Sequence, residues 1–424
     1  MLARVVILSL VLLATIGGLS GRLLLLNAPA HTAQDRRNPL DSLLQSTPAL
    51  APVLRHAERY ELQIIYTQID RDAQNRPHFT QYDYRLDERA YFNPASLVKL
   101  PVAILSLQKL NQLRQQTPAL SRRSIMATGT AGRCQTAVPF AAPADSDQVA
   151  SVGNYIKRML LVSDNQAYNR LYEFLGQHYL QKQLPTLGYP NVRITRRFAP
   201  CDTAANRCTN PVTFHHPDGS IIYRQPATCN PYAWPNPLGR IRKGRGYYAG
   251  GQLIHQPYDF TTANYLSLQA ITDLLRTVLF SESVPIGRLP DLTNADFSFL
   301  RYYLGATPGA SGFRPYASPA YFPSYKKYFY YGRKPQAPLQ PGLRIYNIVG
   351  MSHGYLADCA YFFDEQSGAE FMLSAVLYVN ADNILNDGQY EYSSVGLPFL
   401  AHLGQAVLRR EQKRSRPKQS SMGK

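Results

Sequence analysis

Two short segments combine hydroxyl, amine and amide side chains in an order that suits acyl transfer. Ser96 and Lys99 lie three residues apart in a segment that is expected to start a helix, so their side chains share one face and can meet. Ser163 and Asn165 follow later, between two expected helices. A serine hydroxyl beside an amine of lowered pKa can act as a nucleophile with its own base. Ser96 and Lys99, held together at the start of a helix, therefore predict an acyl-transfer nucleophile and its base.

Each segment alone has a plainer interpretation. A Ser-x-x-Lys pattern arises by chance roughly once in a chain of this length. Ser163, Asp164 and Asn165 are residue types that favour helix starts, and Asp164 in particular is expected to bond its own turn. The chemical prediction depends on both segments, in this order and between these elements.

The segment from Asn93 to Leu113 must position the first pair. Asn93 can cap the first helical turn, and Pro94 suits the first helical position. Apolar residues on nearly every side predict a helix buried at the centre of a domain. Pro101 lacks the N–H that would bond the carbonyl four residues earlier, which predicts a kink or a loosened turn beside Ser96.

Strand patterns occur near both ends of the chain. Alternating apolar and polar residues predict an antiparallel hairpin from 60–69 and 79–91. Three more strands and a last helix are expected at 343–349, 355–363, 371–380 and about 395–410. This order predicts an α/β (α+β) fold with one antiparallel sheet from both chain ends, flanked by helices, and an inserted all-helical lobe.

The middle of the chain combines helices with long irregular segments. Helices are expected over 149–162, 166–175 and 267–280. Segments rich in Pro, Gly or Tyr predict loops over 117–147, 195–251 and 313–341. The tyrosines and arginines of the last two loops indicate either a wide substrate groove or, more plainly, aromatic filling of an irregular surface.

The two ends of the chain differ in composition from the residues between them. Residues 1–27 read as an export signal or N-terminal membrane anchor, which predicts a periplasmic or cell-envelope location. The remaining divisions are a linker at 28–48, one domain at 49–410 and a basic, disordered tail at 411–424. Within the domain we expect an α/β lobe from 49–92 and 343–410, and a helical lobe with long loops from 93–342.

The composition favours a protein with a basic surface. The 424 residues carry 45 Lys and Arg against 28 Asp and Glu, a formal net charge of +17. This charge indicates a solvated basic surface or, for an exported protein, attraction to acidic envelope polymers or membranes. The basic residues are scattered and no nucleic-acid-binding motif occurs, so no nucleic-acid partner is expected. No motif asks for a metal, nucleotide or flavin cofactor.

Five cysteines in an exported chain predict disulfides with one thiol left over. Cys201 and Cys208 are the expected pair because they are close in sequence. A metal site built from Cys201, Cys208, His215, His216 and Cys229 is the rival interpretation, but its spacing matches no standard zinc pattern.

Ser96-x-x-Lys99 followed by Ser163-Asp164-Asn165 resembles the motif set of the penicillin-recognising serine hydrolases, in particular the class A β-lactamase-like branch. The resemblance extends over about 49–410 and implies a β-lactamase/DD-peptidase-like fold. It implies that Ser96 is the acylated nucleophile, that its backbone N–H is half of an oxyanion hole, and that Lys99 takes or relays its proton. Ser163 would pass the proton to the leaving nitrogen, and Asn165 would hold the substrate amide and Lys99.

The resemblance implies a small-molecule or cell-wall peptide acyl substrate. The first function expected is hydrolysis of a cyclic amide such as a β-lactam. The alternatives are a cell-wall DD-peptidase or esterase with the same nucleophile, and a non-catalytic binding protein that keeps the fold. The oligomeric state is left open.

Two departures from the family pattern stand out. At the expected Lys-Thr/Ser-Gly motif only Gly350 matches, and Ile348 occupies the lysine position. Ser352 and His353 lie just beyond and can offer a hydroxyl and an imidazole to the substrate. Arg344 or another arginine is the candidate for the missing cation.

The second departure concerns the base that activates water for deacylation. Asp202 and Asn206 have the spacing of the family's glutamate and asparagine, with aspartate in place of glutamate. The shorter side chain matters, because a misplacement of about 1 Å can cost a hundredfold in rate. Asp202 is therefore expected either to be this base or to be a loop or N-cap carboxylate.

Overall fold

A computed structural model of the chain describes residues 38–132, 134, 136–142, 146–199 and 201–416. The chain divides into two units, Met1–Arg37 and Asn38–Lys424, and the described residues all belong to the second. The predicted export signal or anchor at 1–27 and the tail at 417–424 lie outside the described residues. Within the described part, no helix is both long enough and apolar enough to cross a membrane.

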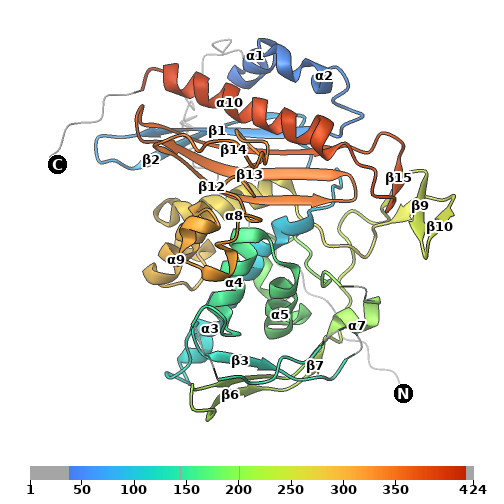
Figure 1. Ribbon diagram of the computed structural model, residues 1–424, viewed down its shortest axis with the longest axis vertical. Helices are drawn as coiled ribbons and strands as arrows, with labels where there is room; N and C mark the ends of the chain where they lie inside the picture. The colour runs from blue at the N-terminus through green and yellow to red at the C-terminus, as the bar shows by residue number, and fades with distance from the viewer. Residues whose placement is uncertain (1–37, 133, 135, 143–145, 200, 417–424) are drawn as a thin grey trace, which may run out of the picture. The chain divides into compact units, whose positions relative to one another are not determined.

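One five-stranded sheet is assembled from segments near both ends of the chain (Figure 1). All its pairings are antiparallel, and β1 pairs with both β14 and β2. The strand order is β12 (Leu343–Ser352), β13 (Tyr355–Asp364), β14 (Ala369–Tyr378), β1 (Gln63–Arg71) and β2 (Pro77–Tyr84). The predicted sheet and its N-terminal hairpin are confirmed, and β12 forms one end of the sheet.

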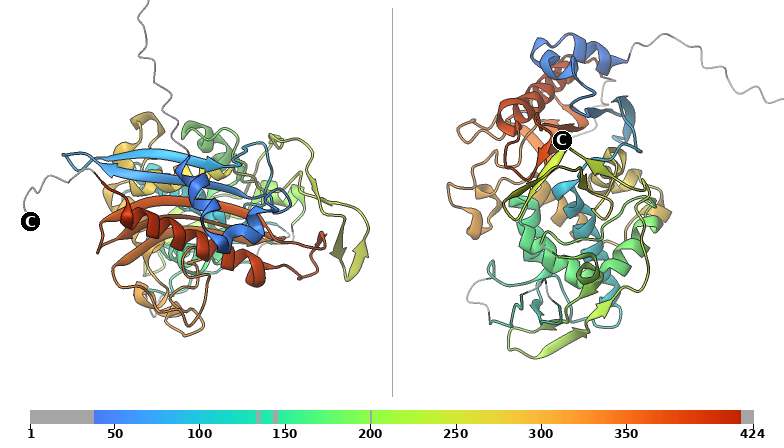
Figure 2. Two further views of the ribbon diagram at one scale, coloured as in Figure 1. Left: turned by 90° about the horizontal axis from the view of Figure 1, so that it is seen from above. Right: turned by 90° about the vertical axis from the view of Figure 1, so that its right-hand side faces the viewer.

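The sheet separates two hydrophobic cores because successive side chains of a strand point to opposite faces. Ile64 and Tyr66 lie in a core that includes residues of α10 (Leu397–Lys413) and α1 (Pro39–Gln45). These two helices cover one face of the sheet (Figure 2). Ile65 on the other face joins a larger core that contains the central helices.

The buried helical segment begins with a 3-10 turn, η2 (Ala95–Val98), and continues as α3 (Lys99–Arg114). Asn93 Oδ1 accepts a hydrogen bond from Ala95 N–H at 2.9 Å, as expected for a capping residue. Pro101 lies in the first turn of α3, where its missing N–H removes no bond within the α-helix. The predicted loosened turn is therefore η2, which carries Ser96.

The inserted lobe is mainly helical but also contains small sheets. α4 (Val152–Val162), α5 (Asn165–Leu175) and α8 (Leu268–Leu279) confirm the predicted helices. The expected loops also hold α7 (Thr203–Arg207) and short strands: β3 (Ile125–Thr128), β5 (Val212–His215) and β6 (Ile221–Gln225) form one sheet, and β4 (Cys208–Thr209) pairs with β7 (Thr228–Cys229). Strands of two to five residues are too short to show a periodicity in the sequence.

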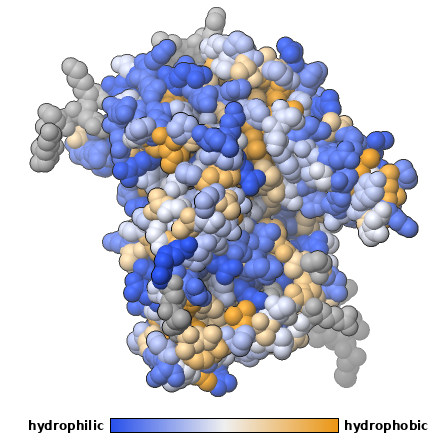
Figure 3. All heavy atoms as spheres, in the orientation of Figure 1, coloured by the Kyte–Doolittle hydropathy of each residue, from blue (hydrophilic) through white to orange (hydrophobic). Residues whose placement is uncertain are grey.

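A hairpin of β9 (Gly246–Ala249) and β10 (Gln252–Ile254) projects at the right of Figure 1. Figure 3 shows that the surface in this view is mostly hydrophilic, with hydrophobic residues in separate groups, one of them on this hairpin. Tyr248 is one of its exposed side chains. This face therefore carries no single broad apolar surface.

The disulfides differ from the predicted pair. Cys134 pairs with Cys201, and Cys208 pairs with Cys229 because β4 and β7 place the latter two opposite each other. The expected Cys201–Cys208 pair is wrong. One thiol is left over as expected, and it is the buried Cys359. The rival metal site loses three of its ligands to disulfides, and no group of three or more ligating side chains occurs among the described residues.

Segments at the two ends are more ordered than predicted. The expected linker contains α1, whose N-cap Asn38 accepts a hydrogen bond from Leu40 N–H. The chain then forms the short helices η1 (Pro48–Leu50) and α2 (Ala51–Leu54). At the other end, Arg414 forms ion pairs with Asp70 and Glu411, so the first residues of the expected disordered tail are held in place.

Candidate active site

The Lys99 side chain is completely buried among oxygen atoms from two separate segments. Its Nζ lies 2.8 Å from Ser96 Oγ, 2.9 Å from Ser163 Oγ and 2.7 Å from Asn165 Oδ1. It also donates to the backbone carbonyl of Ser163. The turn between α4 and α5 thus meets the start of α3, and the structure brings these four sequence-predicted residues together.

Burial lowers the pKa of Lys99 to about 7, although the nearby Asp164 carboxylate opposes the shift. The cause is the loss of hydration, which penalises the ammonium form. The Phe198 ring, 5.2 Å from Nζ, contributes to this enclosure. Near neutral pH a substantial share of the amine is therefore unprotonated and able to accept the Ser96 proton.

The turn that carries Ser163 and Asn165 is fixed by Asp164. Ser163 ends α4 in the left-handed region, with φ 62°. Asp164 caps α5 by accepting from Ala167 N–H at 3.0 Å, and its other oxygen accepts from two nitrogens of Arg158 at 2.9 and 2.7 Å. The prediction that Asp164 bonds its own turn is confirmed, and this leaves Ser163 and Asn165 to face Lys99.

Ser96 lines an open cavity of about 260 Å³. Asn165, Ser352 and His353, which the sequence suggested as substrate-binding residues, line the same cavity. Gly350 lies at the contact between β12 and the turn before Ser96. A Cβ atom at this position would stand 2.7 Å from the carbonyl oxygen of Pro94, so only glycine allows so close an approach.

The Lys-Thr/Ser-Gly motif expected around Gly350 lacks its cation. Ile348 is completely buried in the core, and Arg344 is an exposed residue that pairs with Glu365 at 2.5 Å. The suggestion that Arg344 replaces the lysine is therefore wrong. A different arginine, Arg196, lines the cavity beside Ser96.

Hydrogen bonding fixes the tautomer of His353. Asn93 Oδ1 accepts from a backbone N–H, so its Nδ2 is the atom that faces His353 Nδ1 at 3.1 Å and donates to it. Ser352 Oγ lies 2.6 Å from the same ring nitrogen. Burial, helped by the charge of Arg196, lowers the pKa of His353. A neutral imidazole whose Nδ1 accepts carries its proton on Nε2, so this ring offers a donor rather than a base.

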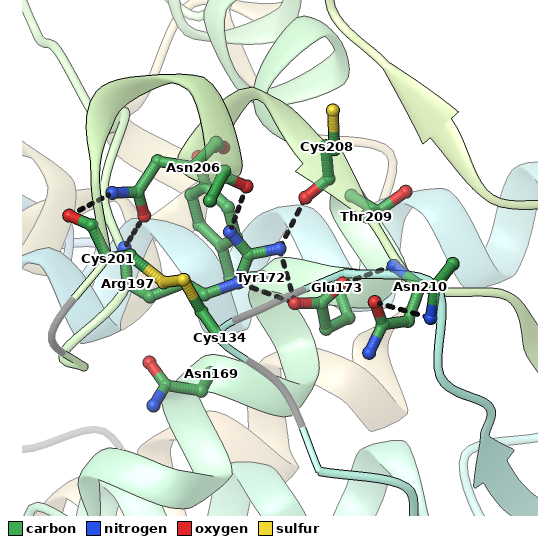
Figure 4. A network of polar contacts seen from close by, with 12 residues as sticks. Cys134, Asn169, Tyr172, Glu173, Arg197, Cys201, Asn206, Cys208, Thr209 and Asn210 are labelled. Atoms are coloured by element: carbon green, nitrogen blue, oxygen red, sulfur yellow. Dashed lines mark hydrogen bonds and ion pairs between the residues drawn. A yellow bond between two sulfur atoms is a disulfide. The ribbon is translucent and has the colours of Figure 1, made fainter.

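A buried ion pair between Arg197 and Glu173 holds the backbone around Arg197 against α5 (Figure 4). Arg197 Nε donates to Glu173 Oε1 at 2.5 Å, and both side chains are nearly fully buried. Arg197 also donates to the carbonyls of Ala205 and Cys208, while its backbone N–H donates to Asn206 Oδ1. Sequence reasoning missed this pair; its one signal was an acidic residue, Glu173, on the buried face of a helix.

Asp202 lies away from the cavity that Ser96 lines. It is exposed, and its carboxylate caps α7 by accepting from Ala205 N–H at 2.7 Å. The N-cap interpretation is confirmed, and this placement gives no support to Asp202 as the base that activates water. The Asn206 side chain is buried, and its Nδ2 donates a hydrogen bond to the backbone carbonyl of Asp202.

Comparison with known proteins agrees with this geometry over part of the chain. The model of the beta-lactamase enzyme family matches residues 49–218, which include Ser96, Lys99, Ser163 and Asn165. Among curated proteins none matches the chain.

Several solved structures are similar to this chain at low sequence identity. They include a beta lactamase from Xanthomonas campestris pv. campestris str. ATCC 33913, with 15% identity, 87% of this chain and 97% of the other covered, and a TM-score of 0.47. The beta-lactamase from Desulfarculus baarsii DSM 2075 has 13% identity, 87% and 98% coverage, and a TM-score of 0.45. A class A beta-lactamase from Mycobacterium abscessus has 17% identity, 88% and 97% coverage, and a TM-score of 0.44.

Proposed function

We propose that the chain is a β-lactamase-like serine hydrolase that opens a β-lactam or a related cyclic amide through an acyl-enzyme on Ser96. The match of the beta-lactamase enzyme family over residues 49–218 supports this proposal. The observation that carries the proposal is the buried Lys99 amine, 2.8 Å from Ser96 Oγ and with a pKa lowered to about 7. Such an amine can remove the serine proton at the pH where the protein works. The reaction takes place in the cell envelope or periplasm, where the N-terminal segment would direct the chain.

The proton follows a path through the two serines. Neutral Lys99 takes the proton of Ser96 as Oγ attacks the carbonyl carbon, and the Ser96 N–H donates to the developing oxyanion. Lys99 Nζ lies 2.9 Å from Ser163 Oγ, so Ser163 can hand a proton to the leaving nitrogen as the C–N bond breaks. Asn165 Oδ1 faces Lys99, which leaves its Nδ2 to donate to the substrate amide.

Water activation is the step with the least support from the site. Asp202 lies outside the cavity, and the lining carboxylate Asp259 accepts from the Thr261 N–H at 2.7 Å. His353 accepts at Nδ1 and so offers no free base there. We infer that the acyl-enzyme forms faster than it is hydrolysed.

A cell-wall DD-peptidase or esterase is the second candidate, and one feature favours it. A larger hollow of about 590 Å³ also reaches Asn165 and is lined by Tyr316, Tyr321 and Tyr325. This hollow gives room for a substrate longer than a β-lactam. It also fits one of the two interpretations of the irregular segment 313–341, a groove lined by its tyrosines, rather than the plainer one, aromatic filling of the surface.

The intact mass of the purified protein, with and without a penicillin and a cephalosporin, tests both candidates. We expect a mass increase equal to the drug on the wild-type protein and none on Ser96→Ala. An adduct that persists for hours favours the peptidase, and one that decays within minutes favours a β-lactamase. An adduct on Ser96→Ala, or none on the wild-type protein, would contradict the proposal.

A further inference from the structure

A hydrogen bond between side chains ties the turn before Ser96 to the end of β12. Asn93 Nδ2 donates to Nδ1 of His353 at 3.1 Å, and Asn93 Oδ1 accepts from the backbone N–H of Ala95 at 2.9 Å. One amide thus holds the backbone just before the nucleophile and also a separate element. Ser352 Oγ lies 2.6 Å from the same ring nitrogen, but it belongs to the same hairpin as His353 and connects nothing to the turn.

The backbone on both sides of this bond is in the left-handed region, which non-glycine residues rarely adopt. Ala95, directly before Ser96, has φ 46°, and His353 has φ 51°. Such conformations persist where neighbouring contacts hold them, and they gather at functional sites. The Asn93 side chain makes contacts of this kind, because it bonds both strained residues.

The turn between β12 and β13 does not itself require histidine at position 353. Ser352 and Tyr355 are paired residues of the two strands, so His353 and Gly354 form a two-residue hairpin turn, with φ 51° and 81°. Asparagine or glycine suits the first of these positions best, because either adopts a positive φ more readily. The preference of the turn therefore does not explain the imidazole, whereas its bond to a neighbouring element does.

The surroundings of the imidazole keep it neutral. The rings of Tyr258 and Phe260 lie 5.6 and 5.4 Å from the ring of His353. Burial and the positive charge of Arg196 lower the pKa of His353 below its ordinary value. Asp259 lines the same cavity, but its carboxylate is exposed to solvent, which screens its charge.

We propose that the hydrogen bond from Asn93 to His353 is a latch that holds the turn of Ser96 in the position from which its hydroxyl attacks. His353 acts as a positioning residue, through Asn93. Because Asn93 Nδ2 can only donate, the latch holds while Nδ1 of the imidazole is unprotonated. The inference rests on the proposed function for the identity of the nucleophile, Ser96, and not for its substrate.

Two substitutions separate the latch from a direct contact of the ring with a substrate. His353→Asn and His353→Gly both suit the turn. Asparagine places an amide oxygen near the position of Nδ1 and can accept from Asn93, whereas glycine cannot. The readout is the rate at which a fluorophosphonate adds to Ser96, followed by intact mass. In this reaction Oγ bonds to phosphorus, fluoride leaves with the electron pair of the broken P–F bond, and Lys99 takes the serine proton.

We expect His353→Gly to slow this labelling by about 10- to 100-fold, since a small misplacement of a reacting group has an effect of this size. His353→Asn should recover most of the loss. Equal slowing by both variants would mean that the ring acts directly, and wild-type labelling of His353→Gly would mean that the bond positions nothing. Either result would overturn the proposal.

Asn93→Ser tests the other side of the bond. Serine can still cap Ala95, but its hydroxyl is one bond shorter than the amide and does not reach His353. It should slow labelling about as much as His353→Gly, and the double variant should be no slower than either, because both changes remove one interaction. Losses that add in the double variant would contradict the latch.

Asn75→Gly is the matched control. Asn75 also has a positive φ, 61°, in the turn between β1 and β2, and it is not among the residues that line the Ser96 cavity. This variant should be labelled at wild-type rate.

The titration of His353 tests the bond without any reaction. A donor that bonds the neutral ring lowers the pKa of His353, so Asn93→Ser should raise this pKa toward the ordinary value of about 6.5. NMR of protein with nitrogen-15 histidine follows the titration, and His353→Gly identifies the signal by removing it. An unchanged pKa in Asn93→Ser would overturn the latch.

Benzylpenicillin separates this inference from the proposed function. If the fluorophosphonate labels Ser96 but penicillin forms no adduct, the proposed function is wrong, and the variants above still decide the latch. If penicillin adducts form at a rate that His353→Gly leaves unchanged, the proposed function holds and the latch is wrong. No labelling of Ser96 by either reagent would overturn both.

Discussion

At the scale of single residues, the proposed mechanism predicts that Lys99 sets the pH dependence of acylation. Its pKa is lowered to about 7 by burial, and only the neutral amine can take the Ser96 proton. The acylation rate constant should therefore fall about tenfold per pH unit below pH 7 and level off above it. Rates of adduct formation between pH 5 and 9 measure this profile.

A substitution at the same position checks the assignment. Lys99→Arg keeps a positive charge that no accessible pH removes, so acylation should be abolished across the whole range. A Lys99→Arg protein that is acylated at wild-type rate, or a wild-type profile that is flat from pH 5 to 9, would show that Lys99 is not the base.

Asp202 allows a second test at this scale, because its position separates a catalytic role from a capping role. Asp202→Asn keeps a good helix cap but removes the charge, and it should leave the lifetime of any adduct and the melting temperature unchanged. Asp202→Ala should lower stability by about 0.5–2 kcal/mol and also leave the adduct lifetime unchanged. A lifetime that increases at least tenfold in Asp202→Asn would instead identify Asp202 as the water-activating base.

At the scale of elements, the site depends on how closely β12 approaches the turn that carries Ser96. Gly350→Ala would place a Cβ atom 2.7 Å from a backbone carbonyl that cannot move independently of this turn. Because an error near 1 Å in a reacting group can cost about a hundredfold, we expect acylation to slow by about that factor. Circular dichroism should show that the fold is retained.

Gly309→Ala is the matched control for this variant, because a Cβ atom there meets nothing within 4 Å. It should be acylated at wild-type rate. Wild-type acylation by Gly350→Ala would mean that β12 can withdraw without disturbing Ser96.

The loop that carries Arg196 depends on the buried ion pair beneath it. Glu173→Gln would leave the Arg197 guanidinium buried without its counter-charge, and such losses cost about 3–5 kcal/mol. Urea unfolding should show this decrease. Glu282→Gln breaks a pair that is 3.9 Å apart and exposed, so it should change stability by less than about 0.5 kcal/mol. Equal effects of the two variants would contradict a structural role for the buried pair.

At the scale of the whole molecule, the parts that sequence predicted are those with long, regular patterns. The central sheet, the buried α3 and the two helices around Ser163 follow from periodicity and from residues that start or stop helices. The convergence of Ser96, Lys99, Ser163 and Asn165 followed from motif order rather than from any spacing in the chain.

The parts that sequence did not predict depend on contacts between distant segments. The cysteine pairs follow from the short strands β4 and β7, whose pairing no local pattern indicates. Arg196 was one of many scattered arginines, and only the folding of its loop onto α5 places it in the cavity. The role of Asp202 was open because a capping carboxylate and a catalytic one look alike in sequence.

The stability of the whole domain includes the cost of burying Lys326. Its Nζ is buried and has no hydrogen-bond partner among the described residues, whereas Nζ of the adjacent Lys327 donates to Asn347 Oδ1 at 2.8 Å and to two carbonyls. Burial, with the charges of Lys327 and Lys99, lowers the pKa of Lys326 well below its ordinary value. The unfolded chain keeps the ordinary pKa near 10.4, so below that pH it binds a proton that the folded state binds less readily.

Stability is therefore lost as the pH falls from about 10.4 toward the lowered pKa of the folded state, at about 1.4 kcal/mol per pH unit. Lys326→Met removes this cost while it keeps a long apolar side chain, so it should raise the free energy of unfolding at pH 7. The gain should shrink toward zero above pH 10. Lys334→Met, at an exposed position in the same segment, should change stability at neither pH. Urea unfolding at pH 7 and pH 10 measures both variants. A Lys326→Met protein that is less stable at pH 7 would mean that this ammonium is paired in solution and that its burial carries no such cost.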